Sequence, residues 1–124
     1  MVRSLKSYKD KRGSLAEVLK GDQVKHVYIS TTKPNMERGG HYHKRKTEWF
    51  MVIKGLGKLS LLDLKTNERI NLMLSGRKLV VVEVQPYTHH SIQNIGRSLM
   101  YLLVCSNEVF NPSDPDTHEL KGEF

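Results

Sequence analysis

Histidines gather in two short segments of the chain, and their spacing suits the binding of a metal ion. In the first segment, His41 and His43 stand two residues apart. Side chains two apart on a β-strand point to the same face, so both imidazoles are expected on one side of a sheet. Glu48 follows after a short polar turn and would open the next strand, from which its carboxylate could reach that face. Two imidazoles and a carboxylate suit a divalent transition metal.

The second segment contains the adjacent pair His89 and His90. Only one residue of such a pair can face a cavity in regular β structure, and His90 shares its face with Ile92. The predicted metal ligands are therefore His41, His43, Glu48 and His90. The predicted cofactor is a divalent transition metal, zinc first, with nickel, manganese or iron as alternatives.

Strand signals dominate the elements that would position these side chains. One short helix is predicted at 14–20, where Ser14 and Glu17 form a capping box. Beyond it, short stretches rich in β-branched or alternating residues predict strands at 24–32, 38–43, 49–53, 57–64, 68–74, 79–84, 90–94 and 99–105. This pattern predicts one all-β domain over 1–124, but it does not choose between a sandwich, a barrel and a jelly roll.

Composition narrows the class of protein. The chain has 124 residues, 38% of them hydrophobic and 27% charged, which is typical of a globular domain. No apolar run approaches the ~20 residues that span a bilayer, and no secretion signal opens the chain. The one cysteine, Cys105, lies in an apolar run and is expected to be a buried strand thiol. A cytoplasmic location without membrane contact is therefore expected.

The formal net charge of +7 could attract an anionic partner. The basic residues are dispersed, with the densest cluster at 44–46 beside the first histidines. Zinc-finger spacing and RNA-binding aromatic signatures are absent from the sequence, so a nucleic-acid partner is not expected. A phosphorylated small molecule is one anionic partner compatible with this charge, and a basic face that is simply solvated is the alternative.

The spacing of the first segment resembles that of the cupins. Their first motif runs H-x-H, three or four residues, E, six residues, G, and His41, His43, Glu48 and Gly55 match it without a gap. The resemblance implies the fold that the strand pattern leaves open, a double-stranded β-helix or jelly-roll barrel.

The second cupin motif, P-x-G-x-x-H-x-x-x-N, is matched only at its end. His90 and Asn94 stand at its last two defined positions. Gln85 and Tyr87 occupy the positions of its proline and glycine, and Pro86 follows one residue later than the motif has its proline. The departure concerns the turn that leads to His90.

Segments outside the motifs are similar to one branch, the sugar-nucleotide cupins of polysaccharide biosynthesis. They are 10–13, 29–34, 38–43 and 107–112, and the similarity extends over about residues 8 to 117. The chain resembles the C-terminal cupin domain of bifunctional capsular-polysaccharide enzymes that act on UDP-linked 4-keto-6-deoxy-N-acetylhexosamines. It more distantly resembles dTDP-4-keto-6-deoxyglucose 3,5-epimerases and dTDP-sugar 3,4-ketoisomerases. A stand-alone version, without the reductase domain of the bifunctional enzymes, is expected.

This resemblance implies an enzyme, an epimerase or isomerase that removes a proton beside the ketone of a nucleotide-linked 4-keto-6-deoxy sugar. Two arrangements conflict. In metal-free relatives the base maps onto His41, whereas in the capsule enzymes the corresponding residues hold a metal. A metal-bound imidazole cannot also be the free base, and His89 or Tyr101 would then take that role. The presence of Glu48 favours the metal.

The resemblance also implies residues that bind substrate. Arg12 and Arg38 match positions that contact the nucleotide diphosphate, and the planar guanidinium suits phosphate oxygens. By its residue type, Trp49 could stack on the base or the sugar, or it could be an aromatic residue of the core. Exchange of N-terminal strands in relatives implies a homodimer. Two alternatives remain open, a non-catalytic sugar-binding or regulatory cupin and a metal-dependent cupin dioxygenase.

Overall fold

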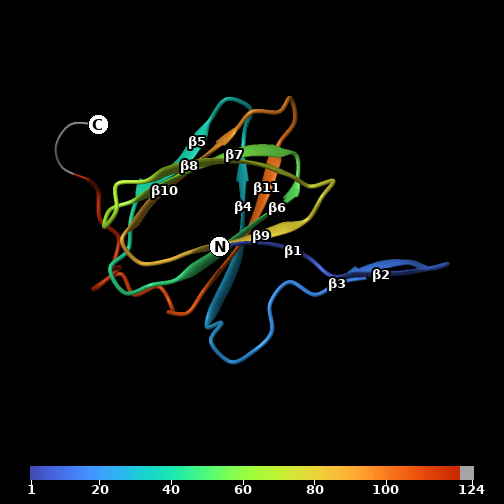
Figure 1. Cartoon of the computed structure of the whole chain (residues 1–124), viewed down its shortest axis with the longest axis horizontal. Helices are drawn as coiled ribbons and strands as arrows, with labels where there is room; N and C mark the ends of the chain where they lie inside the picture. Colours follow the sequence, from blue (N-terminus) through green and yellow to red (C-terminus); the bar gives the residue numbers. More distant parts are fainter. Residues whose placement is uncertain (121–124) are drawn as a thin grey trace.

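Eleven β-strands and no helix build the part of the chain that the structure, a computed structural model, describes, which is residues 1–120. Most of the chain forms two facing sheets (Figure 1). The strands are β1 (Val2–Ser4), β2 (Ser7–Asp10), β3 (Gly13–Ala16), β4 (His26–Thr32), β5 (Glu37–His41), β6 (Glu48–Lys54), β7 (Leu56–Asp63), β8 (Arg69–Ser75), β9 (Val80–Val84), β10 (Thr88–Asn94) and β11 (Met100–Ser106).

The five-stranded sheet has the order β1-β9-β6-β11-β4, and the four-stranded sheet has the order β5-β10-β7-β8, with every pairing antiparallel. Alternate side chains of both sheets point inward, as the period of two requires. They form one core that includes Phe50, Val52, Leu59, Val82, Val84, Ile92, Leu102 and Val104. This is the architecture of a jelly-roll barrel and confirms the predicted cupin fold.

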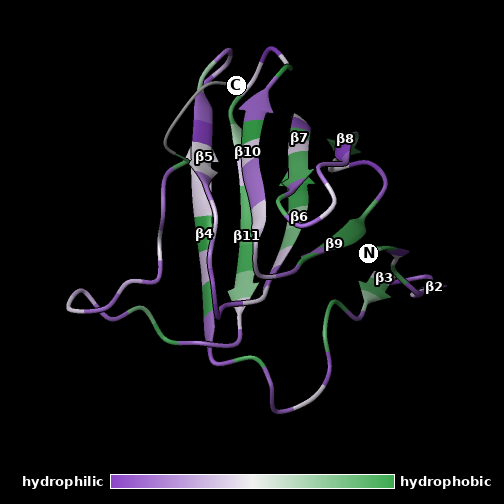
Figure 2. Ribbon diagram, turned by 60° about the vertical axis from the view of Figure 1, so that its left-hand side comes forward, coloured by the Kyte–Doolittle hydropathy of each residue, from purple (hydrophilic) through white to green (hydrophobic). Residues whose placement is uncertain are grey.

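A second apolar layer covers the outer face of the five-stranded sheet. Trp49 and Met51 of β6 point to this face, because they alternate with the inward Phe50 and Val52. Val18 and Leu19, in the irregular segment before β4, pack over them. Figure 2 shows hydrophobic residues along β9 and β11, which belong to this sheet.

The predicted helix at 14–20 is wrong. Residues 13–16 form β3, which pairs with β2 in a hairpin that aligns Tyr8 with Leu15. A helix of about two turns is marginal by itself, and here the hairpin and the docking of Val18 and Leu19 on the large sheet replace it. Separately, residues 1–120 contain no helix long and apolar enough to cross a membrane.

The eight strands predicted beyond the helix are confirmed, with boundaries shifted by a few residues at most. Cys105 is a buried thiol of β11, as predicted. The sequence pattern missed β1, β2 and β3. They are short and largely exposed, and the alternation of buried and exposed residues that marks a strand is therefore absent from them.

Candidate metal site and ligand cavity

Three histidines converge at one end of the barrel interior. The ring centroids of His41 and His90 lie 4.8 Å apart, and the ring of His43 lies 5.2 Å from each of the other two. One ring nitrogen of each falls within 4.8 Å of the others. His43 and His90 are buried, whereas His41 is partly open to solvent. The structure thus brings together the three imidazoles that the sequence predicts to bind metal.

A β-bulge in β5 directs His41 toward His90. Gly39 pairs with Ser91 and His41 pairs with His90, so Gly40 is an extra residue in the register between β5 and β10. Both glycines have positive φ angles, 92° and 81°, which side-chain-bearing residues rarely adopt. Bulges commonly re-aim side chains next to functional sites. Here the bulge sets His41 directly opposite His90, with both side chains on the inner face.

Backbone carbonyls orient the other two imidazoles. The Nδ1 of His43 lies 2.7 Å from the carbonyl oxygen of Asp116, and the Nδ1 of His90 lies 3.0 Å from that of Thr88. A carbonyl only accepts hydrogen bonds, so each Nδ1 carries the proton and donates it. The Nε2 atoms of both rings therefore face the cluster. This arrangement is common among metal-binding histidines, because it selects the tautomer whose free nitrogen faces the metal.

Glu48, at the start of β6, joins the cluster from the opposite sheet. Its Oε1 lies 2.8 Å from the Nε2 of His43 and 3.3 Å from the Nε2 of His90. The second contact lacks hydrogen-bond geometry, and the Nε2 of His90 has no hydrogen-bond partner among residues 1–120. A buried nitrogen without a partner is costly, and a metal ion would satisfy it. The donor set and this nitrogen both fit a divalent transition metal.

Burial and the neighbouring side chains set the protonation states of the cluster when no metal is bound. Burial and the neighbouring His90 and His43 lower the pKa of His41 to about 4. Burial alone would raise the pKa of Glu48, but His43 and His90 outweigh it and lower that pKa to about 2. Burial likewise opposes the charged form of His43, yet the hydrogen bond to Glu48 raises its pKa. At neutral pH, His41 is thus neutral and Glu48 is a carboxylate.

A cavity of about 190 Å³ opens beside the cluster, between the edge strands β4 and β5. His41, Glu48 and His90 line it together with apolar core residues. Arg38 also lines it, and its guanidinium donates to the carbonyl oxygen of Thr31 across the gap. The predicted substrate-binding Arg38 therefore lies at the same cavity as the histidines.

His43 belongs to the cluster but does not line this cavity, and neither do four other predicted site residues. Trp49 is buried on the outer face and donates its indole N–H to Glu83, 3.0 Å away. Tyr101 alternates with the inward Leu102, and His89 alternates with the inward His90. Arg12 lies in the β2–β3 hairpin and pairs with Asp10. The roles predicted for these four residues stay predictions.

Tyr28 and Ser30 of β4 line the cavity, and the sequence interpretation missed both. Burial, with the charge of Glu48, raises the pKa of Tyr28 to about 12. The alternation of residues along β4 was a usable signal, because it separates Tyr28 and Ser30 from Val27 and Ile29. It does not say which face meets a cavity, and that depends on the opposite sheet.

The turn before His90 has the backbone conformation expected of a glycine, the residue that the second cupin motif has at this position. Tyr87, at the glycine position, has a φ of 60°. Its N–H donates to the carbonyl oxygen of His43 at 2.7 Å, and its own carbonyl accepts from the N–H of Leu64 at 2.9 Å. These bonds hold the left-handed conformation without a glycine. The departure from the motif therefore leaves the approach to His90 intact.

Comparison with known proteins agrees with this geometry. Residues 8–118 match the family model of the polysaccharide biosynthesis C-terminal domain. A relative from Pseudomonas aeruginosa, UDP-2-acetamido-2,6-beta-L-arabino-hexul-4-ose reductase, is 36% identical over 111 residues, which are 90% of this chain and 30% of that protein.

The fold is similar to those of two further proteins of known structure. The capsular polysaccharide assembling protein CapF from Staphylococcus aureus superposes with a TM-score of 0.76 at 34% identity, covering 95% of this chain and 34% of that one. The sugar 3,4-ketoisomerase QdtA from Thermoanaerobacterium thermosaccharolyticum, in complex with TDP, superposes with a TM-score of 0.80 at 20% identity, over 98% of this chain and 88% of that one. The ketoisomerase likeness concerns the fold. This chain spans about a third of the length of the reductase and of CapF.

Proposed function

Because this chain belongs to the polysaccharide biosynthesis C-terminal domain family, we propose that it is an epimerase or isomerase acting on a nucleotide-linked 4-keto-6-deoxy sugar. The observation that carries the proposal is the meeting of three histidines and Glu48 beside a cavity that Arg38 also lines. The name of the Pseudomonas aeruginosa relative describes a UDP-linked hexul-4-ose, and this supports a UDP-linked 4-ketone as the substrate.

The four residues His41, His43, His90 and Glu48 hold a divalent transition metal in this proposal. The Nε2 of His90 supports it, since this buried nitrogen has no hydrogen-bond partner among residues 1–120. The Nδ1–H of His43 supports it too, because its bond to a carbonyl turns Nε2 toward Glu48 and the cluster. When bound, the metal supplies a positive charge that stabilises an oxyanion on the carbon next to the reacting one. The competing role of His41 as a free base is less favourable, because a pKa of about 4 is far below the value that suits a base at neutral pH.

Tyr28 is the proton donor in this proposal. Its hydroxyl belongs to a residue of the same cavity, and a pKa of about 12 keeps it protonated at neutral pH. The proton that first leaves the carbon beside the ketone goes to a base, the role predicted for His89 or Tyr101 when His41 binds the metal. Tyr28 then returns a proton to that carbon from one face of the sugar. Apolar neighbours such as Phe50, Leu59 and Ile92 keep water away from the reacting carbon.

Arg38 binds the diphosphate, and Arg12 contributes from a second copy of the chain. The hairpin that carries Arg12 lies to the side of the two large sheets (Figure 1), away from the cavity of its own chain. A homodimer in which hairpins reach the neighbouring cavity would unite the two arginines. A cytoplasmic location is assigned with this activity, and the single free cysteine, buried in β11, is compatible with it.

The test is hydrogen exchange at the sugar. The protein is incubated in D₂O with a UDP-linked 4-keto-6-deoxy-N-acetylhexosamine, and deuterium beside the ketone is followed by NMR. We expect uptake with the natural protein, none with His41→Asn, and uptake slowed about 10²- to 10⁴-fold with Tyr28→Phe. Binding of the UDP-sugar is measured in parallel by calorimetry. Tight binding without any exchange would refute the enzyme and leave a sugar-binding cupin.

A further inference from the structure

We propose that Asp116 is a positioning residue for the metal site, through which the C-terminal segment 107–118 holds His43 in its ligand geometry. The inference rests on the metal centre of the proposed function. It goes further by assigning a role to a residue outside the barrel and outside the ligand set. The role follows from the unusual location of His43 in the fold.

His43 is the one histidine of the cluster that no strand holds. β5 ends at His41 and β6 begins at Glu48, so His43 lies in the connecting loop 42–47. His41 and His90, in contrast, are fixed by the ladder between β5 and β10. A loop side chain keeps one orientation only where other contacts impose it. The contacts of segment 107–118 meet this requirement.

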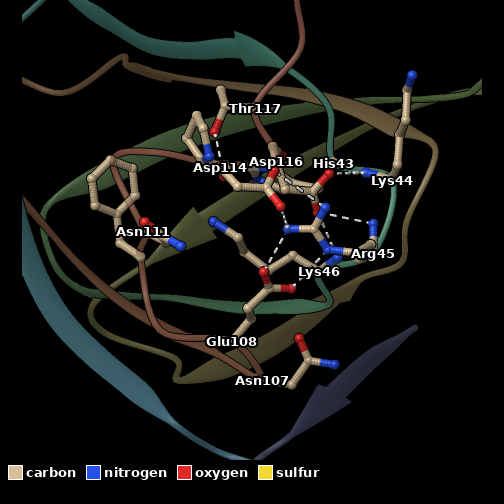
Figure 3. Close-up of polar contacts among 12 residues, drawn as sticks. His43, Lys44, Arg45, Lys46, Asn107, Glu108, Asn111, Asp114, Asp116 and Thr117 are labelled. Carbon is tan, nitrogen blue, oxygen red and sulfur yellow. Dashed lines mark hydrogen bonds and ion pairs between the residues drawn. The ribbon is translucent and has the colours of Figure 1, made fainter.

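The carboxylate of Asp116 binds three successive backbone amides of the loop (Figure 3). Its Oδ1 accepts from the N–H of Lys44 at 2.9 Å, and its Oδ2 accepts from the N–H groups of Arg45 and Lys46 at 2.9 and 3.0 Å. A buried carboxylate is costly unless it is hydrogen-bonded. Asp116 is 2% exposed, and these three donors offset its burial. The loop therefore has one preferred shape directly after His43.

The backbone of the same residue binds the imidazole. The carbonyl oxygen of Asp116 accepts the Nδ1–H of His43 at 2.7 Å, which directs Nε2 toward Glu48. Asp116 has a φ of 52°, in the left-handed region that aspartate, asparagine and glycine tolerate best. The side chain of Asp116 thus binds the loop, and its main-chain carbonyl binds the predicted metal ligand His43. Loss of the first contact would release the second.

Flanking contacts hold the segment against the loop on both sides. Tyr42 and His118 exchange two backbone hydrogen bonds, of 2.9 and 3.0 Å. At the other end, Asn107 accepts the N–H of Thr47 on its Oδ1 at 3.0 Å. Arg45 adds exposed ion pairs with Glu108 and Asp114 (Figure 3). Asp116 is the residue of the segment that touches both the loop amides and His43.

Three variants of the full chain test the proposal. Asp116→Gly removes the carboxylate without strain at positive φ, and Asp116→Asn keeps that backbone preference but replaces one acceptor oxygen by an N–H₂ group. Asp114→Asn is the matched control, because Asp114 is exposed in the same segment and contacts only Arg45 among these loop residues. Zinc affinity is measured by competition with a chromogenic chelator. Partners that orient metal ligands are typically worth 10- to 100-fold in affinity, so we expect a loss of about that size in both Asp116 variants and none in Asp114→Asn.

A second measurement separates positioning from simple stability. In the metal-free protein, ¹⁵N NMR of the imidazoles reports whether Nδ1 of His43 carries a hydrogen-bonded proton, with His43→Gln identifying the signal. Both ring nitrogens face acceptor oxygens, one of Asp116 and one of Glu48, so we expect both to be protonated in the natural chain and in Asp114→Asn. In the Asp116 variants we expect the hydrogen-bonded Nδ1–H signal to be lost or shifted toward that of a solvent-exposed imidazole. Variants that only melt at a lower temperature, with zinc affinity and the Nδ1–H signal unchanged, would overturn the proposal. A natural chain without zinc affinity would instead refute the metal centre, and the Nδ1–H measurement would still decide the role of Asp116. If Asp116→Gly does not fold, Asp116→Asn decides.

Discussion

The single residue His90 illustrates why the histidine cluster is suited to bind a metal ion. Its ring is buried, its Nδ1 is committed to the carbonyl of Thr88, and its Nε2 has no hydrogen-bond partner among residues 1–120. Leaving a buried polar atom unpaired costs about 1–3 kcal/mol. A fold that keeps such an atom next to a carboxylate and two further imidazoles is poised to gain free energy from a metal ion.

Replacement of His90 by glutamine is predicted to abolish the stabilisation of the protein by zinc. A ligand that binds only the folded state adds about 2.7 kcal/mol to the free energy of unfolding when its free concentration is 100 times its Kd. We expect this gain in the natural chain and its loss in His90→Gln, measured by urea unfolding with and without buffered zinc. His26→Gln is the control, since His26 lies on β4 and is not a member of the cluster. Equal stabilisation of all three proteins would remove His90 from the ligand set.

At the scale of elements, the β-bulge between β5 and β10 determines the geometry of the cluster. A regular ladder that continued from the Gly39–Ser91 pair would set Gly40, which has no side chain, opposite His90. The bulge instead pairs His41 with His90. The backbone approach is close, because a Cβ added to Gly39 would lie 2.8 Å from the carbonyl oxygen of His90. The same addition at Gly40 would meet nothing within 4 Å.

Alanine at these two glycines is predicted to have unequal effects. Both residues have positive φ, which costs an alanine about 1–2 kcal/mol. Only Gly39→Ala adds a steric conflict with His90. By the usual scale of overpacking, this conflict is expected to cost a further amount of about 1–3 kcal/mol, as much as inserting an extra methylene. The free energy of unfolding in a chelating buffer measures both. Zinc affinity is expected to fall in Gly39→Ala more than in Gly40→Ala, and equal losses would contradict the account of the bulge.

At the scale of the whole molecule, residues 1–120 leave one edge of the five-stranded sheet open, and within them the β2–β3 hairpin pairs with no other strand. β4 ends the five-stranded sheet, and its outward side chains Val27 and Ile29 are 55% and 58% exposed. The β2–β3 hairpin lies apart from that sheet (Figure 1). Exposed apolar edge strands invite pairing with another chain unless something covers them. This is consistent with the homodimer of the proposed function.

A lysine on the β4 edge is predicted to prevent that association. We expect the natural chain to be dimeric by light scattering coupled to size-exclusion chromatography, and Ile29→Lys to be monomeric, because a charge would be buried at the interface. Ile70→Lys is the matched control, since Ile70 is 51% exposed on β8, the edge of the other sheet. A natural chain that stays monomeric at all concentrations would contradict the dimer and the sharing of Arg12.

The amino-acid sequence by itself determined the fold class and the members of the cluster. Alternation along short segments predicted eight of the strands, and the spacing of His41, His43, Glu48 and His90 identified the side chains that meet. The first signal is local, because the period of a strand places residues two apart on the same face. The spacing identified which side chains meet, but not how, since His43 lies in the loop 42–47 and not on the strand with His41.

The tertiary structure alone decided the features that depend on residues far apart in the chain. Hairpin pairing and docking on the large sheet, and not the capping signals at Ser14 and Glu17, set the conformation of residues 13–19. Tyr87 holds a glycine-like conformation because Leu64 and His43 bind its backbone. Asp116 reaches His43 across 73 positions of sequence. No local propensity encodes these contacts, since each exists only when both partners have been brought together by the folded barrel.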